Sequence, residues 1–221
     1  MKKLVLSVAV VLAGLAVASA QGTIKFYNIG SSYLVSTNGT GTGVGQNGTT
    51  TGLMDKTANS YYFALLMSSA APTSSNPLTG GWTVAQTGGV NLVGNNYTLI
   101  AGGITGNGGA NGVAVDGWAA GSTKYVELVG WSASLGTTWS QITSQLSTGW
   151  TSAGYYGVSS TGQVASGGVG TPASPAAALF GSTGQIASGW MLSGVSPVPE
   201  PTTLALVALG GASLLLIRRR K

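Results

Sequence analysis

The chain has 221 residues and a formal net charge of +5, and this charge comes from its two ends. The charged residues between positions 21 and 198 cancel: they are Lys25, Lys56, Lys124, Asp55, Asp116 and Glu127. A neutral domain lacks the basic surface that neutralises phosphates, so we expect no nucleic-acid binding. The 37 glycines and the charged fraction of 6% exclude a helical bundle, while the hydrophobic fraction of 43% is too high for a disordered chain.

The chain contains neither cysteine nor histidine. Disulfides and thiolate sites are therefore excluded, and the commonest general base and metal ligand is missing. A glycosidase needs two facing carboxylates, which only Asp55, Asp116 and Glu127 could supply within the domain. We predict no catalytic residue, no metal site, no cofactor and no enzymatic activity, with a glycoside-active enzyme kept as an alternative.

Residues 1–20 have the three parts of a secretory signal peptide. Lys2 and Lys3 form a positive start, residues 4–17 form a short apolar core, and small residues follow at Ala18 and Ala20. This pattern predicts that signal peptidase cleaves before Gln21. Residues 21–195 would then form the exported domain.

Apolar patterns predict a series of short strands in this domain. The predicted strands lie at residues 23–28, 33–36, 60–67, 82–85, 90–93, 97–101 and 124–131. The run at 60–67 is apolar throughout, as in a central strand covered on both faces. Residues 124–131 alternate, but the pattern does not tell which face is buried. Asn-Gly pairs in the glycine-rich tracts 38–52 and 102–112 indicate tight turns.

One α-helix is expected late in the order. Thr138 and Gln141 have the spacing of a capping box, apolar residues follow at helical spacing, and Gly149 stands where the helix would stop. A second helical turn is predicted from Ser174 to Gly181. The heptapeptide at 161–167 recurs with one change at 183–189 and suggests two similar strand entries. The whole predicts an all-β fold, an antiparallel β-sandwich or jelly roll with one or two short helices.

Most tryptophans follow a glycine, and two interpretations of this pairing stay open. The tryptophans concerned are Trp82, Trp118, Trp131, Trp150 and Trp190. In the structural interpretation, the glycine lets the large ring lie over bare backbone. In the functional interpretation, some rings are exposed and stack on sugar rings, as in a carbohydrate-binding module.

The C-terminal segment 196–221 has three consecutive parts. A short motif, Val198-Pro199-Glu200-Pro201, must be extended because its prolines do not fit a helix. Residues 202–217 are uncharged and apolar, and as a transmembrane helix they would span roughly 24 Å of a ~30 Å hydrocarbon core. A basic end follows, which would stay on the cytoplasmic side of the membrane: Arg218, Arg219, Arg220 and Lys221.

These three parts, in this order, closely resemble the PEP-CTERM sorting signal of Gram-negative bacteria. The resemblance implies that the chain is transiently anchored in the inner membrane and that an exosortase removes the tail. The domain would then reach the cell surface or the medium. Many members of this family accompany exopolysaccharide production, which implies a structural or adhesive role in the extracellular matrix. A simple C-terminal anchor, in which the Pro-Glu-Pro is a chance linker, is the alternative.

Overall fold

The computed structural model describes residues 21–25, 35–37, 52–54, 59–91, 104–105, 112–168, 174–181, 184–187, 189–197 and Leu209. The predicted signal peptide, the motif at 198–201, the basic end and the predicted strand at 97–101 lie outside these residues. Among the described residues, no helix is long and apolar enough to cross a membrane. The predicted transmembrane helix at 202–217 lies outside them apart from Leu209.

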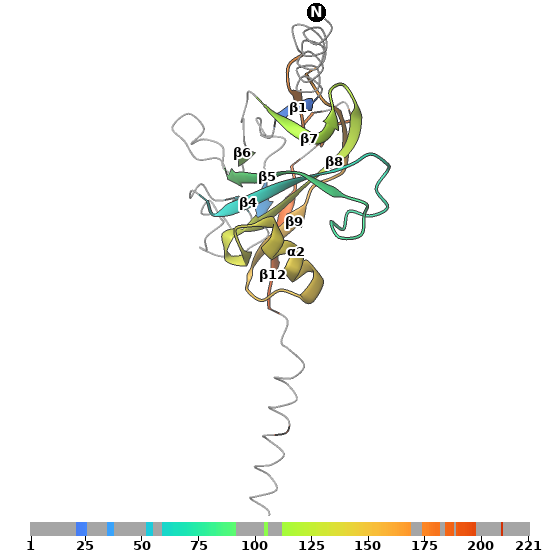
Figure 1. The fold of residues 1–221 in the computed structure, drawn as a ribbon. Coiled ribbons are helices and arrows are strands. Elements are labelled where there is room, and N and C mark those ends of the chain that lie inside the picture. Colours follow the sequence, from blue (N-terminus) through green and yellow to red (C-terminus); the bar gives the residue numbers. More distant parts are fainter. Residues whose placement is uncertain are drawn as a thin grey trace, which may run out of the picture.

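The described residues form mostly β-structure, in two sheets (Figure 1), which confirms the predicted β-rich class. The strands are β1 (Gln21–Lys25), β2 (Ser36–Thr37), β3 (Gly52–Leu53), β4 (Tyr61–Ser68), β5 (Thr83–Asn91), β6 (Ile104–Thr105), β7 (Val113–Ala119), β8 (Thr123–Ser132), β9 (Gly154–Val158), β10 (Gly162–Ala165), β11 (Ala177–Ala178) and β12 (Met191–Val195). The helical elements are the 3-10 helix η3 (Ala133–Leu135) and the α-helix α2 (Trp139–Thr148).

The small sheet has the order β11-β1-β7, and the large sheet has the order β3-β2-β12-β9-β8-β4-β5-β6, with β10 paired to β8. Most neighbours are antiparallel, as predicted. Two pairs are parallel, β1 with β11 and β12 with β2, so the prediction of a purely antiparallel fold is wrong at these positions. Local patterns do not reveal such pairings, because they join segments far apart in the sequence.

Strands β4 and β8 form the centre of the large sheet. They pair over the whole length of β4, from Tyr61 opposite Ser132 to Ser68 opposite Tyr125. Aromatic and branched side chains make both segments good strand formers. The predicted strands at 60–67 and 124–131 are confirmed.

Both faces of β8 are buried, which explains why its alternation did not reveal an inner face. Val126 and Leu128 belong to the core that the large sheet shares with the small one, where Trp118 lies. Val129 and Trp131 point the other way, into a second core that includes Ile142 of α2. The central strand therefore has the small sheet on one side and the helix on the other.

The predicted helix is confirmed with its capping box. Thr138 Oγ1 accepts a hydrogen bond from Gln141 N at 3.4 Å, and Gln141 Oε1 accepts one from Thr138 N at 3.1 Å. The helix ends at Gly149, whose N–H donates to Gln145 O at 2.8 Å. The 3-10 helix η3 just before it was not predicted.

Other local predictions differ from the structure. The second helical turn is wrong: Ala177–Ala178 form β11, in which Ala177 pairs with Ile24 of β1, and this tertiary pairing overrides the local Ser-Pro signal. Residues 83–85 and 90–91, from two predicted strands, belong to one irregular strand, β5, which bulges against β4; residues 92–93 lie outside the described residues. Strands β7, β9 and β12 were not predicted, whereas β10 lies in the first copy of the heptapeptide, where the repeat suggested a strand entry.

The two copies of the repeated heptapeptide lie against each other. Gln163 N in the first copy donates a hydrogen bond to Gly184 O in the second. A Cβ at Gly162 would lie only 2.6 Å from Ile186 N, so the bare glycine backbone permits this approach. The first copy contains strand β10, and among the described residues of the second copy Ile186 forms an isolated bridge with Phe180.

Candidate ligand-binding site

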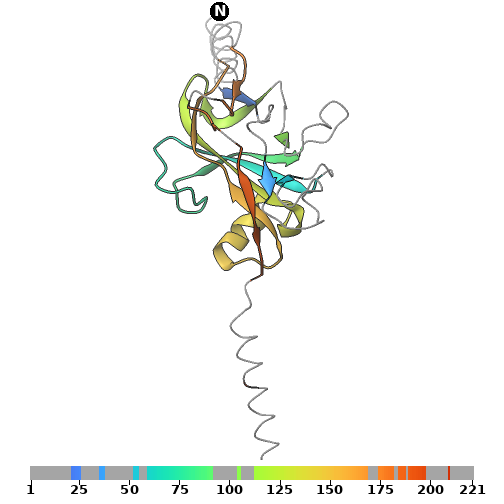
Figure 2. The ribbon, with the colours of Figure 1, turned by 180° about the vertical axis from the view of Figure 1, so that it is seen from behind.

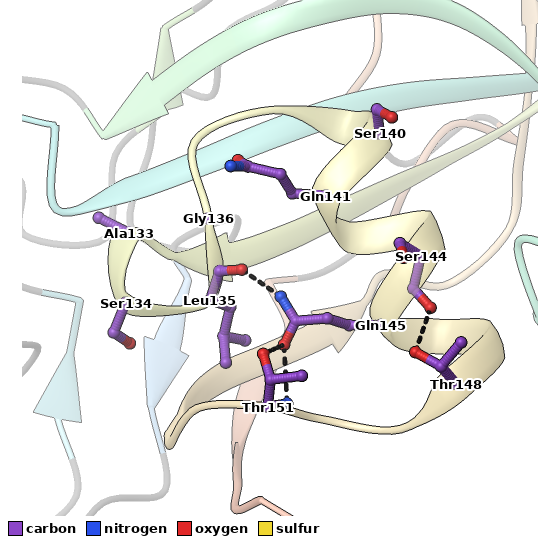
Figure 3. Close-up of a pocket in the computed structure, with 10 residues that line it drawn as sticks. All are labelled: Ala133, Ser134, Leu135, Gly136, Ser140, Gln141, Ser144, Gln145, Thr148 and Thr151. Carbon is purple, nitrogen blue, oxygen red and sulfur yellow. Dashed lines mark hydrogen bonds between the residues drawn. The ribbon is translucent and has the colours of Figure 1, made fainter.

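A hollow of about 570 Å³ lies between η3 and α2 (Figure 3). Its lining residues are Ala133, Ser134, Leu135, Gly136, Ser140, Gln141, Ser144, Gln145, Thr148 and Thr151. The volume is within the range of small-molecule sites. The lining is mainly hydroxyl and amide groups, and it carries no charge. Helix α2, which forms one wall of the hollow, lies at the end of the domain towards which β12 runs (Figure 2).

Gln145 fixes the two walls of the hollow relative to each other. It is 9% exposed, and its Nε2 donates to Leu135 O in η3. Its Oε1 accepts hydrogen bonds from Thr151 N and Thr151 Oγ1, both at 3.2 Å (Figure 3). One buried amide thus joins η3, α2 and the segment that follows the helix.

Gln141 is fixed by its own carbonyl oxygen. Oε1 accepts from Thr137 N at 2.8 Å and from Thr138 N at 3.1 Å. Gly136 makes room for this amide, because a Cβ there would lie 2.8 Å from Oε1. Gly136 also has φ +135°, which disfavours a side chain.

Three polar groups on α2 remain free to bind a ligand. Within the described part of the chain, no hydrogen bond engages Ser140 Oγ, Ser144 Oγ or Gln141 Nε2. Ser140 and Ser144 are one helical turn apart and so lie on the same face. This wall can therefore donate and accept hydrogen bonds, although its lining offers no charge and no titratable group.

Three of the five tryptophans that follow a glycine are buried. Trp118 and Trp131 are each 1% exposed, and Trp190 is 9% exposed. Trp118 Nε1 donates to Ser122 O and Trp131 Nε1 to Gly136 O, both at 2.8 Å. No sugar can stack on these faces, which restricts the stacking prediction to Trp82 and Trp150, both partly exposed.

Bare glycine backbone lies close to aromatic rings at two positions, Gly130 and Gly80. A Cβ at Gly130 would lie 2.6 Å from Cε1 of Phe63, its partner across the strands. A Cβ at Gly80 would lie 2.5 Å from Cδ1 of Trp82. These contacts agree with the structural interpretation that glycine gives a large ring room beside bare backbone.

The carboxylates considered for catalysis differ in position. Asp55 lies outside the described residues. Asp116 is exposed on β7 and accepts a hydrogen bond from Gln21 Nε2 at 2.8 Å. Glu127 is fully buried in the middle of β8. The two described carboxyl groups therefore belong to different sheets, and one of them has no access to solvent.

Glu127 and Tyr156 form a buried polar pair. The two carboxyl oxygens of Glu127 and the hydroxyl of Tyr156 are buried, and none of these three atoms makes a hydrogen bond of ordinary length and angle. Burial raises the pKa of Glu127 to about 8, and the nearby Thr161 side chain lowers this pKa only in part. Burial, and then the charge of Glu127, raise the pKa of Tyr156. Glu127 is therefore mostly protonated at neutral pH.

Residues 197–221 match the family model described as the PEP-CTERM protein-sorting motif. The chain ends in an exosortase sorting signal. This match confirms the resemblance inferred from the sequence, and it implies export, processing by an exosortase and a location at the cell surface or outside the cell. Only Ser196 separates the matched segment from Val195, the last residue of β12. No curated protein and no solved structure matches the chain.

Proposed function

We propose that the exported domain is a structural or adhesive component of the extracellular matrix that associates with exopolysaccharide. The observation that carries this proposal is the sorting motif at 197–221, which directs the chain outside the cell. In this route, signal peptidase removes residues 1–20, and residues 202–217 with the basic end hold the chain in the inner membrane. An exosortase then cleaves near Pro199-Glu200-Pro201.

The domain suits a passive or binding role better than a catalytic one. Its two sheets share one apolar core, which supports a sandwich architecture. Glycoside hydrolysis uses two carboxyl groups about 5–10 Å apart across a substrate. Burial of Glu127 and exposure of Asp116 on the other sheet do not favour such a pair. We therefore propose no enzymatic activity.

A carbohydrate-binding module that works through aromatic stacking is the second candidate. Trp82 favours it, because this ring is partly exposed and already fixed in place. Its Nε1 donates to Ser74 O at 2.9 Å, and the ring lies over the bare backbone of Gly80. A rigid ring loses little conformational freedom when a ligand binds.

The matrix role is tested by fractionating cultures of the producing bacterium. Full-length protein and a form that lacks residues 197–221 are expressed in a strain without the native copy, and each is followed by immunoblot. We expect the normally sorted domain in the matrix fraction and its release when the exopolysaccharide is degraded enzymatically. The proposal would be contradicted if the domain stayed in the matrix fraction after the exopolysaccharide was degraded, or if it were recovered only in membranes.

A further inference from the structure

We infer that the hollow between η3 and α2 binds a neutral saccharide unit, through Ser140, Ser144 and Gln141 of α2. The inference rests on the proposed matrix function and names the site and the chemical class of its ligand. Three observations carry it: the uncharged lining, the free polar groups on one wall, and the frame that joins the two walls.

The uncharged lining of the hollow selects against charged ligands. No residue between Glu127 and Glu200 is charged, and this stretch supplies both walls and the segments that flank them. A carboxylate or phosphate bound here would lose water without gaining an ionic partner, which is unfavourable. A neutral sugar meets no such penalty, because hydroxyls and amides can replace its water hydrogen bonds one for one.

The free groups have the types and spacing that a sugar ring requires. Ser140 Oγ and Ser144 Oγ both donate and accept, and four residues of helix separate them by about 6 Å along the axis. A single sugar ring can bridge this separation with hydroxyls on its two sides. Ala133 in the opposite wall is partly exposed and offers apolar surface to the C–H groups of the ring.

The orientation of Gln141 follows from its partners. Two backbone N–H groups, of Thr137 and Thr138, donate to the same side-chain atom, and only the carbonyl oxygen can accept both. The free end of the amide is therefore the Nε2 donor, held near the loop of the other wall (Figure 3). Because Gln145 fixes both walls, the backbone that carries the three groups is positioned before a ligand arrives, which lowers the entropic cost of binding.

The test compares two variants of one helix. Full-length protein in detergent micelles is assayed for binding to dextran, galactomannan and xyloglucan, with alginate as an acidic comparison. The double variant Ser140→Ala/Ser144→Ala removes the free hydroxyls of the hollow. The matched control Ser147→Ala removes a hydroxyl from an exposed position on the same helix that does not line it. Circular dichroism verifies that all variants fold.

We expect at least one neutral polymer to bind and alginate to bind more weakly. The double variant loses two hydrogen bonds between uncharged groups, so its affinity for the neutral polymers should fall about tenfold. The affinity of the control variant should not change. Failure of all three neutral polymers to bind, or equal binding by the double variant, would overturn the inference. If Trp82→Ala abolishes binding while the double variant does not, the hollow is the wrong site but the matrix proposal survives. If the protein also fails to partition with exopolysaccharide in cells, that proposal fails as well.

Discussion

The buried Glu127 should make the stability of the domain depend on pH. Its pKa in the folded state is about 8, against 4.5 for an ordinary Glu side chain. A group whose pKa is raised by folding contributes its full stability below the unfolded pKa and loses it as the pH rises through the folded pKa. The free energy of unfolding should therefore fall between about pH 4.5 and pH 8. At 1.36 kcal/mol per pKa unit, the loss is about 5 kcal/mol, or roughly 10–20 °C in Tm.

The assay is thermal unfolding followed by circular dichroism at pH 5, 6, 7 and 8, at constant ionic strength. Glu127→Gln removes the ionisable group while keeping the shape, so its Tm should be nearly constant over this range. The control Asp116→Asn changes an exposed carboxylate and should keep the wild-type slope. A wild-type Tm that is flat from pH 5 to pH 8, or an equal slope in Glu127→Gln, would refute the reasoning that this carboxyl is buried without a partner.

Three further substitutions test packing and capping, each by urea denaturation. Gly130→Ala places a methyl group 2.6 Å from Phe63 Cε1 and should cost about 1–3 kcal/mol, part of which Phe63→Leu should restore. Gln145→Ala leaves Leu135 O and Thr151 N unpaired and should cost about 2–4 kcal/mol, whereas the exposed Gln163→Ala should cost little. Thr138→Ala removes the helix cap and should cost about 1 kcal/mol, with Thr137→Ala as the neutral comparison. Equal stability of a variant and its comparison would show that the assigned contact contributes nothing.

The sequence predicts the elements whose signals are local. Continuous apolar character identifies β4, and the Thr138–Gln141 spacing with a stop at Gly149 identifies α2. Strands β7, β9 and β12 are interrupted by glycines and small polar residues, so their apolar pattern is weak. They form because backbone pairing and contact with existing strands stabilise them. The same long-range pairing turns Ala177 from a predicted helix into a strand.

The sequence predicts the candidate site only in part. Ser140, Ser144 and Thr148 recur at four-residue spacing, which could have indicated a polar helix face. That this face borders a hollow depends on η3, which carries no strong sequence signal, and on the buried amide of Gln145. The Gly-Trp pattern did not predict burial: it is the same at the buried Trp118 and Trp131 and at the partly exposed Trp82.

The most direct test of the central claim, sorting by an exosortase, is the fate of the C-terminal segment in the producing bacterium. Glu200→Gln and a deletion of residues 218–221 are compared with wild type and with Asp116→Asn. Membrane and extracellular fractions are analysed by immunoblot, and the new C-terminus is located by mass spectrometry. We predict that wild type and Asp116→Asn lose the segment and leave the cell, while the two tail variants stay in the inner membrane at full length. Normal processing and release of both tail variants would contradict the account.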